Sequence, residues 1–194
     1  MKILYVACCA VLGMIILSPT VALLVRLPES ERFSELYVLG PWHMAESYPF
    51  NISGDETCRL YLGVSNHMGD LESYLVSVKF RNQTESLPNS ADGLPSELDP
   101  LFEYRFALGR RGVWERDLSF SVGNISRSGN LSRVSSLIVG DDMVTVGKVT
   151  EWDVQNHGFL YQLFFELWRY DADASSYQYD NRFVGIWLNV TMPS

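Results

Sequence analysis

An acidic loop near the C-terminus has residue types that could bind a calcium ion. Asp171 and Asp173 place carboxylates at alternate positions, as at the start of an EF-hand loop. An EF-hand also needs Gly at its sixth position and Glu at its twelfth, where this chain has Ser176 and Arg182. The pattern therefore favours a solvated hairpin loop, and Asp171 and Asp173 are kept as candidate ligands only.

Histidines beside a carboxylate could form a second kind of metal site. The chain has three, His43, His67 and His157, which are too scattered in the sequence to define a site. Folding could still bring His43 and His67 together near a carboxylate. The turn residues around His67 favour a ring that bonds the backbone, so we expect no resident metal or other cofactor and keep His67 as a candidate ligand.

Nucleophilic catalysis lacks its usual sequence signals. No G-x-S-x-G motif is present, and no set of Ser, His and Asp has supporting context. Cys58 lies on the apolar side of an alternating strand pattern, where a buried thiol is unreactive. Asp141 and Asp142 are adjacent, so their side chains would point to opposite faces of a strand rather than into one gap. The sequence therefore predicts a protein that is not an enzyme.

Aromatic side chains are abundant, with ten Tyr and five Trp. The simplest interpretation is a sandwich core together with a belt of rings near a membrane surface. The alternative is a face that binds a sugar or a protein, because rigid aromatic rings supply contact area at such sites. The tyrosines around the last loop are the candidates for this face: Tyr170, Tyr177 and Tyr179.

Five asparagines fit the N-glycosylation pattern N-x-[ST]. They are Asn51, Asn82, Asn124, Asn130 and Asn189. Such triplets also arise by chance in loops rich in Asn and Ser, but five within residues 29–194 are more than chance suggests. We predict that some of them carry glycans, which would place this part of the chain outside the cytoplasm.

An uncharged stretch at residues 3–25 must position everything that follows it. As a helix it would reach about 34 Å, enough to cross a hydrocarbon core of roughly 30 Å. No small-x-small cleavage site follows, so we predict a transmembrane anchor or uncleaved signal at residues 1–28, with a cleaved signal peptide as the alternative. Lys2 and the sequons favour a single-pass protein of the cell membrane with its bulk outside the cytoplasm.

The remainder of the chain is acidic. All 23 acidic residues and 13 of the 15 Lys and Arg residues follow Pro28, so residues 29–194 carry a formal charge of −10. This charge disfavours nucleic acid and anionic lipid as partners, because both select a basic surface. Cys58 is the only cysteine in this part, so no internal disulfide can form there.

Alternation of polar and apolar residues predicts β-strands. It is clearest at residues 57–64 and 74–80, which the turn residues 66–70 would join as a hairpin. The apolar faces of these two strands are Cys58, Leu60, Leu62 and Val64, and Tyr74, Val76, Val78 and Phe80. Further strands are predicted at residues 36–39, 102–108, 114–122, 143–152, 159–170 and 183–190, with loops at 88–100, 126–130 and 171–181. Seven or eight short strands predict a mainly β fold, an antiparallel two-sheet sandwich.

Several phrases of the sequence resemble a known family. FSELYVLGP at 33–41, AESYP at 45–49 and GVSNH at 63–67 are similar to phrases of the DUF1616 family, membrane proteins mostly from archaea. WERDLSF at 114–120 is similar to a later strand of that family, and residues 163–190 to its final hairpin. The resemblance implies an immunoglobulin-like sandwich outside the cell and no established activity. Residues 124–156 look like an insertion, and family members often carry several membrane helices where this chain has room for one.

These observations predict a membrane-anchored cell-envelope protein that is not an enzyme. Its external immunoglobulin-like β-sandwich, residues 29–194, would bind another envelope protein, a surface glycan or a second copy of itself. Two alternatives stay open. One is an accessory subunit that stabilises a polytopic membrane complex through its anchor. The other is an envelope metal-dependent hydrolase that uses loop carboxylates and His67.

Overall fold

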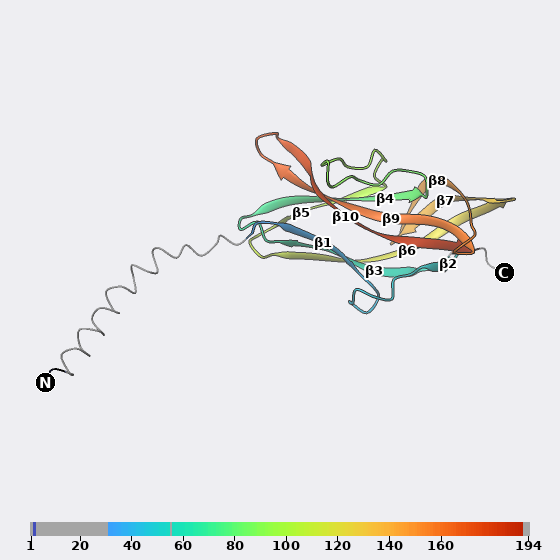
Figure 1. The fold of residues 1–194 in the computed structure, drawn as a ribbon, viewed down its shortest axis with the longest axis horizontal. Helices are drawn as coiled ribbons and strands as arrows, with labels where there is room; N and C mark the ends of the chain where they lie inside the picture. Colours follow the sequence, from blue (N-terminus) through green and yellow to red (C-terminus); the bar gives the residue numbers. More distant parts are fainter. Residues whose placement is uncertain (1, 3–30, 55, 192–194) are drawn as a thin grey trace. The chain divides into compact units, whose positions relative to one another are not determined.

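The alternating pattern folds into ten β-strands in the computed structural model, which describes residues 2, 31–54 and 56–191. The strands belong to one compact unit that begins at Arg32. Their bounds are β1 Ser34–Leu39, β2 Asn51–Ser53, β3 Cys58–Asn66, β4 Glu72–Asn82, β5 Phe102–Leu108, β6 Val113–Ser128, β7 Leu131–Val139, β8 Asp142–Asp153, β9 Gly158–Asp171 and β10 Ser176–Thr191 (Figure 1). Among the described residues, no helix is long and apolar enough to cross a membrane. The anchor predicted at residues 3–25 lies outside them.

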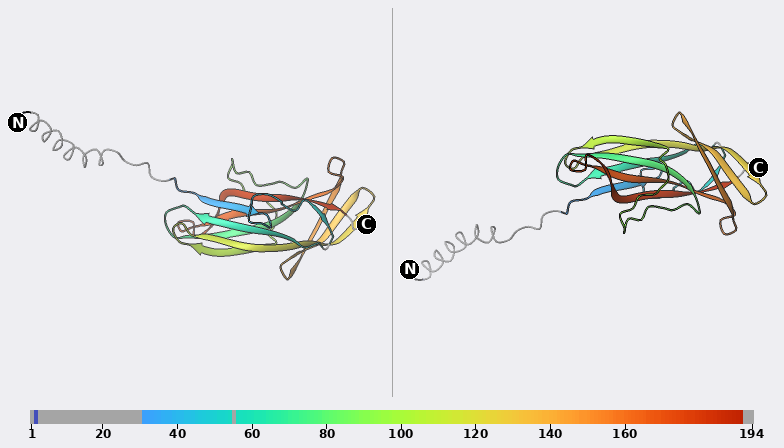
Figure 2. Two further views of the ribbon diagram at one scale, coloured as in Figure 1. Left: turned by 90° about the horizontal axis from the view of Figure 1, so that it is seen from below. Right: turned by 90° about the horizontal axis from the view of Figure 1, so that it is seen from above.

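The strands form two layers that lie face to face (Figure 2). Sheet A has the order β1-β3-β6-β7-β8, and sheet B has the order β5-β4-β9-β10-β2. The end of β8 pairs with the start of β9, Trp152 with Phe159 and Asp153 with Gly158, which joins the two layers into one curled sheet. Every pair of strands is antiparallel except β2 with β10.

This order of strands is that of an immunoglobulin-like sandwich. β1, β3 and β6 take the places of strands A, B and E in one sheet, and β4, β9 and β10 those of strands C, F and G in the other. The prediction of a mainly β sandwich is therefore confirmed. The prediction that all strands pair antiparallel is wrong at β2, which runs parallel to β10. β2 has only three residues and is too short to show an alternating pattern.

The predicted hairpin between residues 57–64 and 74–80 is wrong. β3 pairs with β1 and β6 in sheet A, whereas β4 pairs with β5 and β9 in sheet B. Asn66 fixes this crossing between sheets, because its amide donates to the carbonyl oxygens of Asp70 at 2.7 Å and Leu108 at 2.8 Å. Its Oδ1 accepts from the Met68 N–H at 2.8 Å. The turn residues therefore bend the chain as predicted. The hydrogen bond of Asn66 to the end of β5 directs the following strand into the other sheet.

The predicted apolar faces are confirmed as core. All eight of their side chains are buried between the sheets: Cys58, Leu60, Leu62, Val64, Tyr74, Val76, Val78 and Phe80. Phe120 of β6, Tyr161 and Phe165 of β9 and Leu188 of β10 belong to the same cluster. Alternation works here because each strand turns one face to the other sheet.

Strand ends differ from the prediction where polar strands continue past the core. The loops predicted at 126–130 and 171–181 shrink to turns, because β6 reaches Ser128 and β10 begins at Ser176. β7 was not predicted, since its run of serines hides the alternation. β7 and β8 both lie within the predicted insertion at 124–156, which stays a prediction.

The loop predicted at 88–100 is confirmed and spans residues 83–101, between β4 and β5. It runs back along the outer face of sheet B, above β4 and β9 (Figure 1). Asn89 bends it, because its side-chain oxygen accepts from the N–H groups of Ala91 and Asp92 at 3.1 and 3.3 Å. This covering loop sets the surroundings of the site described below.

Gly63 of β3 lies under the ring of Tyr37, its partner in β1. A Cβ atom at this position would lie 2.1 Å from Tyr37 Cζ. The Tyr37 hydroxyl donates to Glu115 Oε2 at 3.3 Å, which holds the ring across the strand. Only glycine leaves room for this arrangement on the outer face of sheet A.

Replacing Gly63 by alanine should therefore lower the free energy of unfolding. Overpacking of this kind costs about 1–3 kcal/mol. Chemical denaturation of the purified full chain, followed by tryptophan fluorescence, measures the change. Gly109→Ala is the matched control, because a Cβ there meets no atom within 4 Å. Equal losses in the two variants would contradict the role given to the Tyr37 ring.

Candidate functional site

The outer face of sheet B is polar and yet buried. The register of β4 and β9 places Arg81 beside Gln162 and brings Lys79 next to Glu166 along the diagonal. These four side chains are at most 6% exposed. The covering loop, residues 83–101, encloses them. Because buried charge is costly unless it is paired, each of these groups needs a partner beneath the loop.

Lys79 and Glu166 form a buried ion pair. Lys79 Nζ lies 2.8 Å from Glu166 Oε2, and the two side chains are 4% and 0% exposed. Ser96 of the covering loop closes the group, because its carbonyl oxygen accepts from Lys79 Nζ and its N–H donates to Glu166 Oε1, both at 2.8 Å. These contacts balance both charges and hold the loop against β4 and β9.

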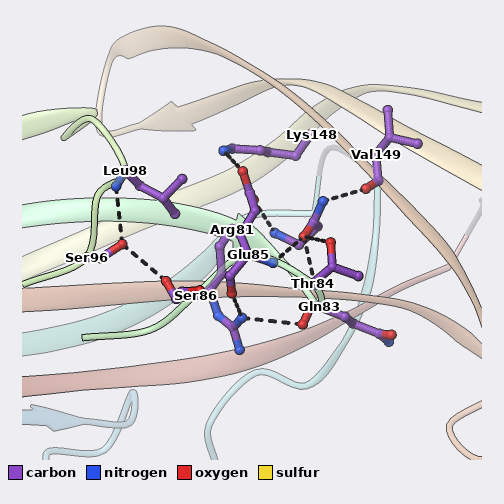
Figure 3. Close-up of polar contacts among 10 residues, drawn as sticks. Arg81, Gln83, Thr84, Glu85, Ser86, Ser96, Leu98, Lys148 and Val149 are labelled. Atoms are coloured by element: carbon purple, nitrogen blue, oxygen red, sulfur yellow. Dashed lines mark hydrogen bonds and ion pairs between the residues drawn. The ribbon is translucent and has the colours of Figure 1, made fainter. Parts of the chain in front are cut away.

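A second group of polar contacts holds the beginning of the covering loop (Figure 3). Arg81 Nε donates to Gln162 Oε1 at 2.7 Å, and the same guanidinium donates to the carbonyl oxygen of Glu85. The Glu85 carboxylate pairs in turn with Lys148 of β8. Burial lowers the pKa of Arg81 below its usual value, while the charge of Glu85 opposes that shift. The loop is thereby tied to β4, β8 and β9.

Beside the covered part, the same face is hollow and open to solvent. A cavity of about 380 Å³ lies between the end of the covering loop, β5 and the β9–β10 hairpin. It is lined by Leu75, Ser77, Lys79, Ser96, Pro100, Glu103, Arg105, Trp168 and Tyr177. Its volume falls within the range of about 300–1,000 Å³ that ligand pockets occupy. We call it the sheet B pocket.

Strand register brings the lining of the sheet B pocket together. Arg105 of β5, Leu75 of β4 and Trp168 of β9 form one row across the sheet. Glu103, two residues before Arg105 and on the same face, pairs with it at 2.8 Å between Oε2 and a guanidinium nitrogen. The Arg105 guanidinium lies 5.7 Å from the centre of the Tyr177 ring. The aromatic rings of Trp168 and Tyr177 and the ion pair of Arg105 with Glu103 therefore surround one opening.

The three candidate tyrosines take different positions. Tyr177 lines the sheet B pocket and packs edge-on against Tyr170, with ring centres 5.4 Å apart. Tyr179 packs on Trp168 at 5.7 Å, and its hydroxyl lies 3.3 Å from Ser90 Oγ in the covering loop. Burial raises the pKa of Tyr179 above its usual value. Tyr179 thus supports Trp168 and the loop, whereas Tyr177 borders the opening.

A larger hollow of about 590 Å³ lies between β5, β6 and the β7–β8 turn. Its charged lining consists of Glu103, Arg116, Asp117, Asp141 and Asp142. Arg116 lies 4.6 Å over the Tyr104 ring, and Asp117 pairs with Arg59, so these two charges already have partners. This hollow is the open flank of the sandwich, and its remaining carboxylates select no particular ligand. We therefore take the sheet B pocket as the candidate site.

The candidate metal ligands have other partners. Asp171 Oδ1 accepts from the Asp173 N–H at 2.8 Å, which closes the turn between β9 and β10. The His67 ring stacks on Phe33 with ring centres 4.5 Å apart, and its Nε2 lies 3.7 Å from Glu35 Oε2. Within the part of the chain that the structure describes, no three His, Cys, Asp or Glu side chains are grouped to hold a metal ion.

Cys58 has the environment of an unreactive cysteine. Its side chain lies in the core and is 6% exposed. Burial raises the pKa of the thiol to about 11, and the nearby charge of Glu56 adds to the shift. The thiolate is the reactive form, so this environment favours the neutral, inert thiol.

The sequon asparagines differ in accessibility. Asn51, Asn124 and Asn130 are exposed, Asn82 is half-buried and Asn189 is buried. Asn189 Nδ2 donates to Asn51 Oδ1 and to the Asn156 carbonyl oxygen, both at 2.8 Å. A glycan on Asn189 would break these bonds. The glycosylation prediction therefore rests mainly on the three exposed residues, Asn51, Asn124 and Asn130.

Sequence reasoning missed the buried charges beneath the covering loop. A signal was present, because Glu166 interrupts an apolar run in β9 and Lys79 lies on the face of β4 opposite the core residues. Neither residue reveals that the other is its partner, since they are 87 positions apart in the sequence. The pairing follows from the register of β4 with β9.

These features define the class of protein: an immunoglobulin-like β-sandwich whose sheet B has a partly covered, partly hollow outer face. The model of the family described as "Domain of unknown function (DUF1616)" matches residues 27–150, and the chain belongs to this family. The family resemblance is thus confirmed. The match ends before β9, so the similarity of residues 163–190 to the family's final hairpin stays a prediction.

Solved structures offer more distant likenesses. The chain is similar to the CARDB domain of a Pyrococcus furiosus protein in complex with di-metal ions, with TM-score 0.43 and 10% identity over 85% of this chain and 100% of that one. It is similar to a PapD-like domain of human CEP192, with TM-score 0.34 and 9% identity over 87% and 93%. A Listeria innocua β-glucosidase in complex with gluconolactone has TM-score 0.34 and 13% identity, over 63% of this chain and 17% of the enzyme. The assignment of the fold rests on the strand pairing of this chain alone. No curated protein matches the chain.

Breaking the buried ion pair should strongly destabilise the protein. Lys79→Met leaves the Glu166 carboxylate enclosed without its counter-charge, and such a change costs about 3–5 kcal/mol. Denaturant unfolding of the full chain measures the loss. The double variant Lys79→Met, Glu166→Leu should recover part of it, because no unpaired charge is then left.

The exposed pair of Arg32 with Asp70 is the control for this substitution. Its atoms lie 3.9 Å apart, and the side chains are 64% and 77% exposed. Arg32→Met should therefore cost less than about 1 kcal/mol. A loss in Lys79→Met no larger than that in Arg32→Met would contradict the importance of the buried pair.

Cys58 should react with iodoacetamide only when the fold opens. At about pH 8 the folded chain should be labelled at least about tenfold more slowly than the urea-unfolded chain, because the raised pKa keeps the thiol neutral. Mass spectrometry of the peptide that carries Cys58 measures the rate. Equal rates would contradict the burial.

The same shift should make stability depend on pH in the alkaline range. The pKa of Cys58 in the folded chain, about 11, lies above its ordinary value of 9.0. The stabilisation is therefore complete below about pH 9 and is lost as the pH rises towards about 11. Below about pH 9 the free energies of unfolding of the wild type and of Cys58→Ala should depend on pH in the same way. Between about pH 9 and 11 the free energy of unfolding of the wild type should fall more steeply than that of Cys58→Ala, and denaturant unfolding curves at each pH measure both.

Proposed function

We propose that the protein is a single-pass membrane protein of the cell envelope that binds a partner outside the cytoplasm and catalyses no reaction. The apolar stretch at residues 3–25 supports the anchor. The exposed sequon residues Asn124 and Asn130 agree with a location outside the cytoplasm. The acidic charge of residues 29–194 suits a soluble external domain.

The observation that carries the proposal is the sheet B pocket. Trp, Tyr and Arg are the residues that dominate binding surfaces, and Trp168, Tyr177 and Arg105 meet at this opening. The charged groups that line it are already paired, Lys79 with Glu166 and Arg105 with Glu103. General acid or base catalysis needs a group that can give or take a proton. Paired charges around fixed rings favour binding over catalysis.

The pocket is built to bind without rearrangement. Its rings stand on β9 and β10, and the covering loop that borders it is held through Ser96 to the buried ion pair. Groups that are already in place lose little conformational freedom on binding, which increases affinity. A fixed wall of this kind suits a recognition module.

The proposal is tested by isolating the full-length protein from its native membrane in mild detergent. Tyr177→Ala should remove the bound partner, because it deletes a ring at the opening. His67→Ala and Asp173→Ala should retain it, since the proposed function needs no metal at these residues. Quantitative mass spectrometry of the co-purified material measures the retention.

Trp42→Ala is the matched aromatic control. Trp42 is 72% exposed and belongs to the loop after β1, away from the pocket lining. It should keep the partner as the wild type does. Retention of the partner by Tyr177→Ala, with loss in His67→Ala or Asp173→Ala, would contradict a binding module and favour a metal-dependent enzyme.

A further inference from the structure

The charges at the sheet B pocket are balanced by ion pairs. Lys79, Arg105 and Glu103 line the pocket. Arg105 pairs with Glu103, and Lys79 pairs with the fully buried Glu166, which is not part of the lining, each at 2.8 Å. The domain around it is acidic, with a formal charge of −10 over residues 29–194. An anion would be repelled by this surrounding field, and a cation would find no unpaired carboxylate among the residues that line the pocket.

The Tyr177 ring already has a cation beside it. The Arg105 guanidinium lies 5.7 Å from the Tyr177 ring centre and supplies that ring with a cation already. A ligand ammonium group would have to displace it, which disfavours the aromatic-cage mode of binding. An uncharged ligand can share the ring edge and face without this conflict.

The two planar polar groups at the opening, one guanidinium and one carboxylate, provide both hydrogen-bond donors and acceptors. The Arg105 side chain is 64% exposed and presents further N–H donors, while the Glu103 carboxylate is 32% exposed and accepts. A hydroxyl group donates and accepts at once, so neighbouring hydroxyls can bond both partners of this ion pair. A ligand with several adjacent hydroxyls therefore matches it.

The rings of Trp168 and Tyr177 supply the complementary apolar surface. Each is fixed by a neighbour, Trp168 by Tyr179 at 5.7 Å and Tyr177 by Tyr170 at 5.4 Å. Such rings pack well against a flat array of C–H groups. A pyranose ring has C–H groups on its faces and hydroxyls around its edge, and a pocket of about 380 Å³ suits a small ligand.

From these features we infer that the sheet B pocket binds a neutral saccharide, with a sugar ring against Trp168 and Tyr177 and its hydroxyls on Glu103 and Arg105. The inference rests on the proposed function, since it names the ligand of the same recognition site. The inference specifies an uncharged sugar, because the pocket offers no partner for an ionised group on the ligand.

The test uses the purified full-length protein in detergent with oligosaccharides of known charge. Neutral hexose trisaccharides built from glucose, mannose or galactose are titrated against it, and glucuronic acid-containing oligosaccharides serve as the acidic counterparts. Saturation-transfer NMR and the change in tryptophan fluorescence report binding. At least one neutral saccharide should bind saturably, and its affinity should stay constant between about 0.1 and 1 M salt because no net charge is involved.

Variants decide whether the binding occurs in this pocket. Arg105→Ala and Tyr177→Ala should each weaken the affinity at least about tenfold, the size expected for a central contact. Arg105 is largely exposed, so its replacement leaves the core intact. Trp42→Ala should bind as the wild type does.

Three results would overturn the inference: no saturable binding of any neutral saccharide, binding unchanged in both variants, or preference for acidic sugars that disappears at high salt. The pull-down separates this failure from that of the proposed function. If Tyr177→Ala loses a co-purified protein while no saccharide binds, the sugar inference fails and the binding module stands. If Tyr177→Ala changes neither measurement, both fail.

Discussion

The outer face of sheet B depends on one ion pair, that of Lys79 with Glu166. Two charges removed from water are tolerated only when they neutralise each other and their remaining hydrogen-bonding capacity is used. Ser96 adds one hydrogen bond to each partner from the covering loop, with its N–H on the carboxylate and its carbonyl oxygen on the ammonium group. The loop therefore shields the pair, and the pair holds the loop. The contact also links β4 to β9, two neighbouring strands of sheet B.

The position of the covering loop divides the outer face into two parts. Beneath the loop the polar side chains are enclosed and paired, which suits a structural role. Beyond its edge Trp168, Tyr177 and Arg105 stay accessible around a hollow. These groups stand on strands, whose positions vary less than those of loops, and their neighbours fix the rings. The recognition site that we propose would thus be preformed, as a consequence of where the covering loop is held.

Much of the fold could be predicted from local patterns, whereas the site could be predicted only in part. Alternation located the core faces of β3 and β4, because one face of each strand packs between the sheets. The same pattern could not show that these strands lie in different sheets, since Asn66 makes that choice through contacts with the end of β5. Tyr177 was identified from composition near a loop. Its partners Arg105 and Trp168 were not, because they reach the pocket through the register of three strands.

Amide hydrogen exchange at Ser96 tests the central claim most directly. This N–H lies in an irregular loop, where unprotected amides exchange rapidly, but here it donates to the buried Glu166 carboxylate. Exchange of the full-length protein, followed by mass spectrometry with fragmentation to single residues, resolves the Ser96 amide from its neighbours. Our account predicts protection comparable to that of amides in the centre of β4. Exchange as fast as in an unstructured peptide would show that the loop is not tied to the ion pair and that the pocket is not preformed.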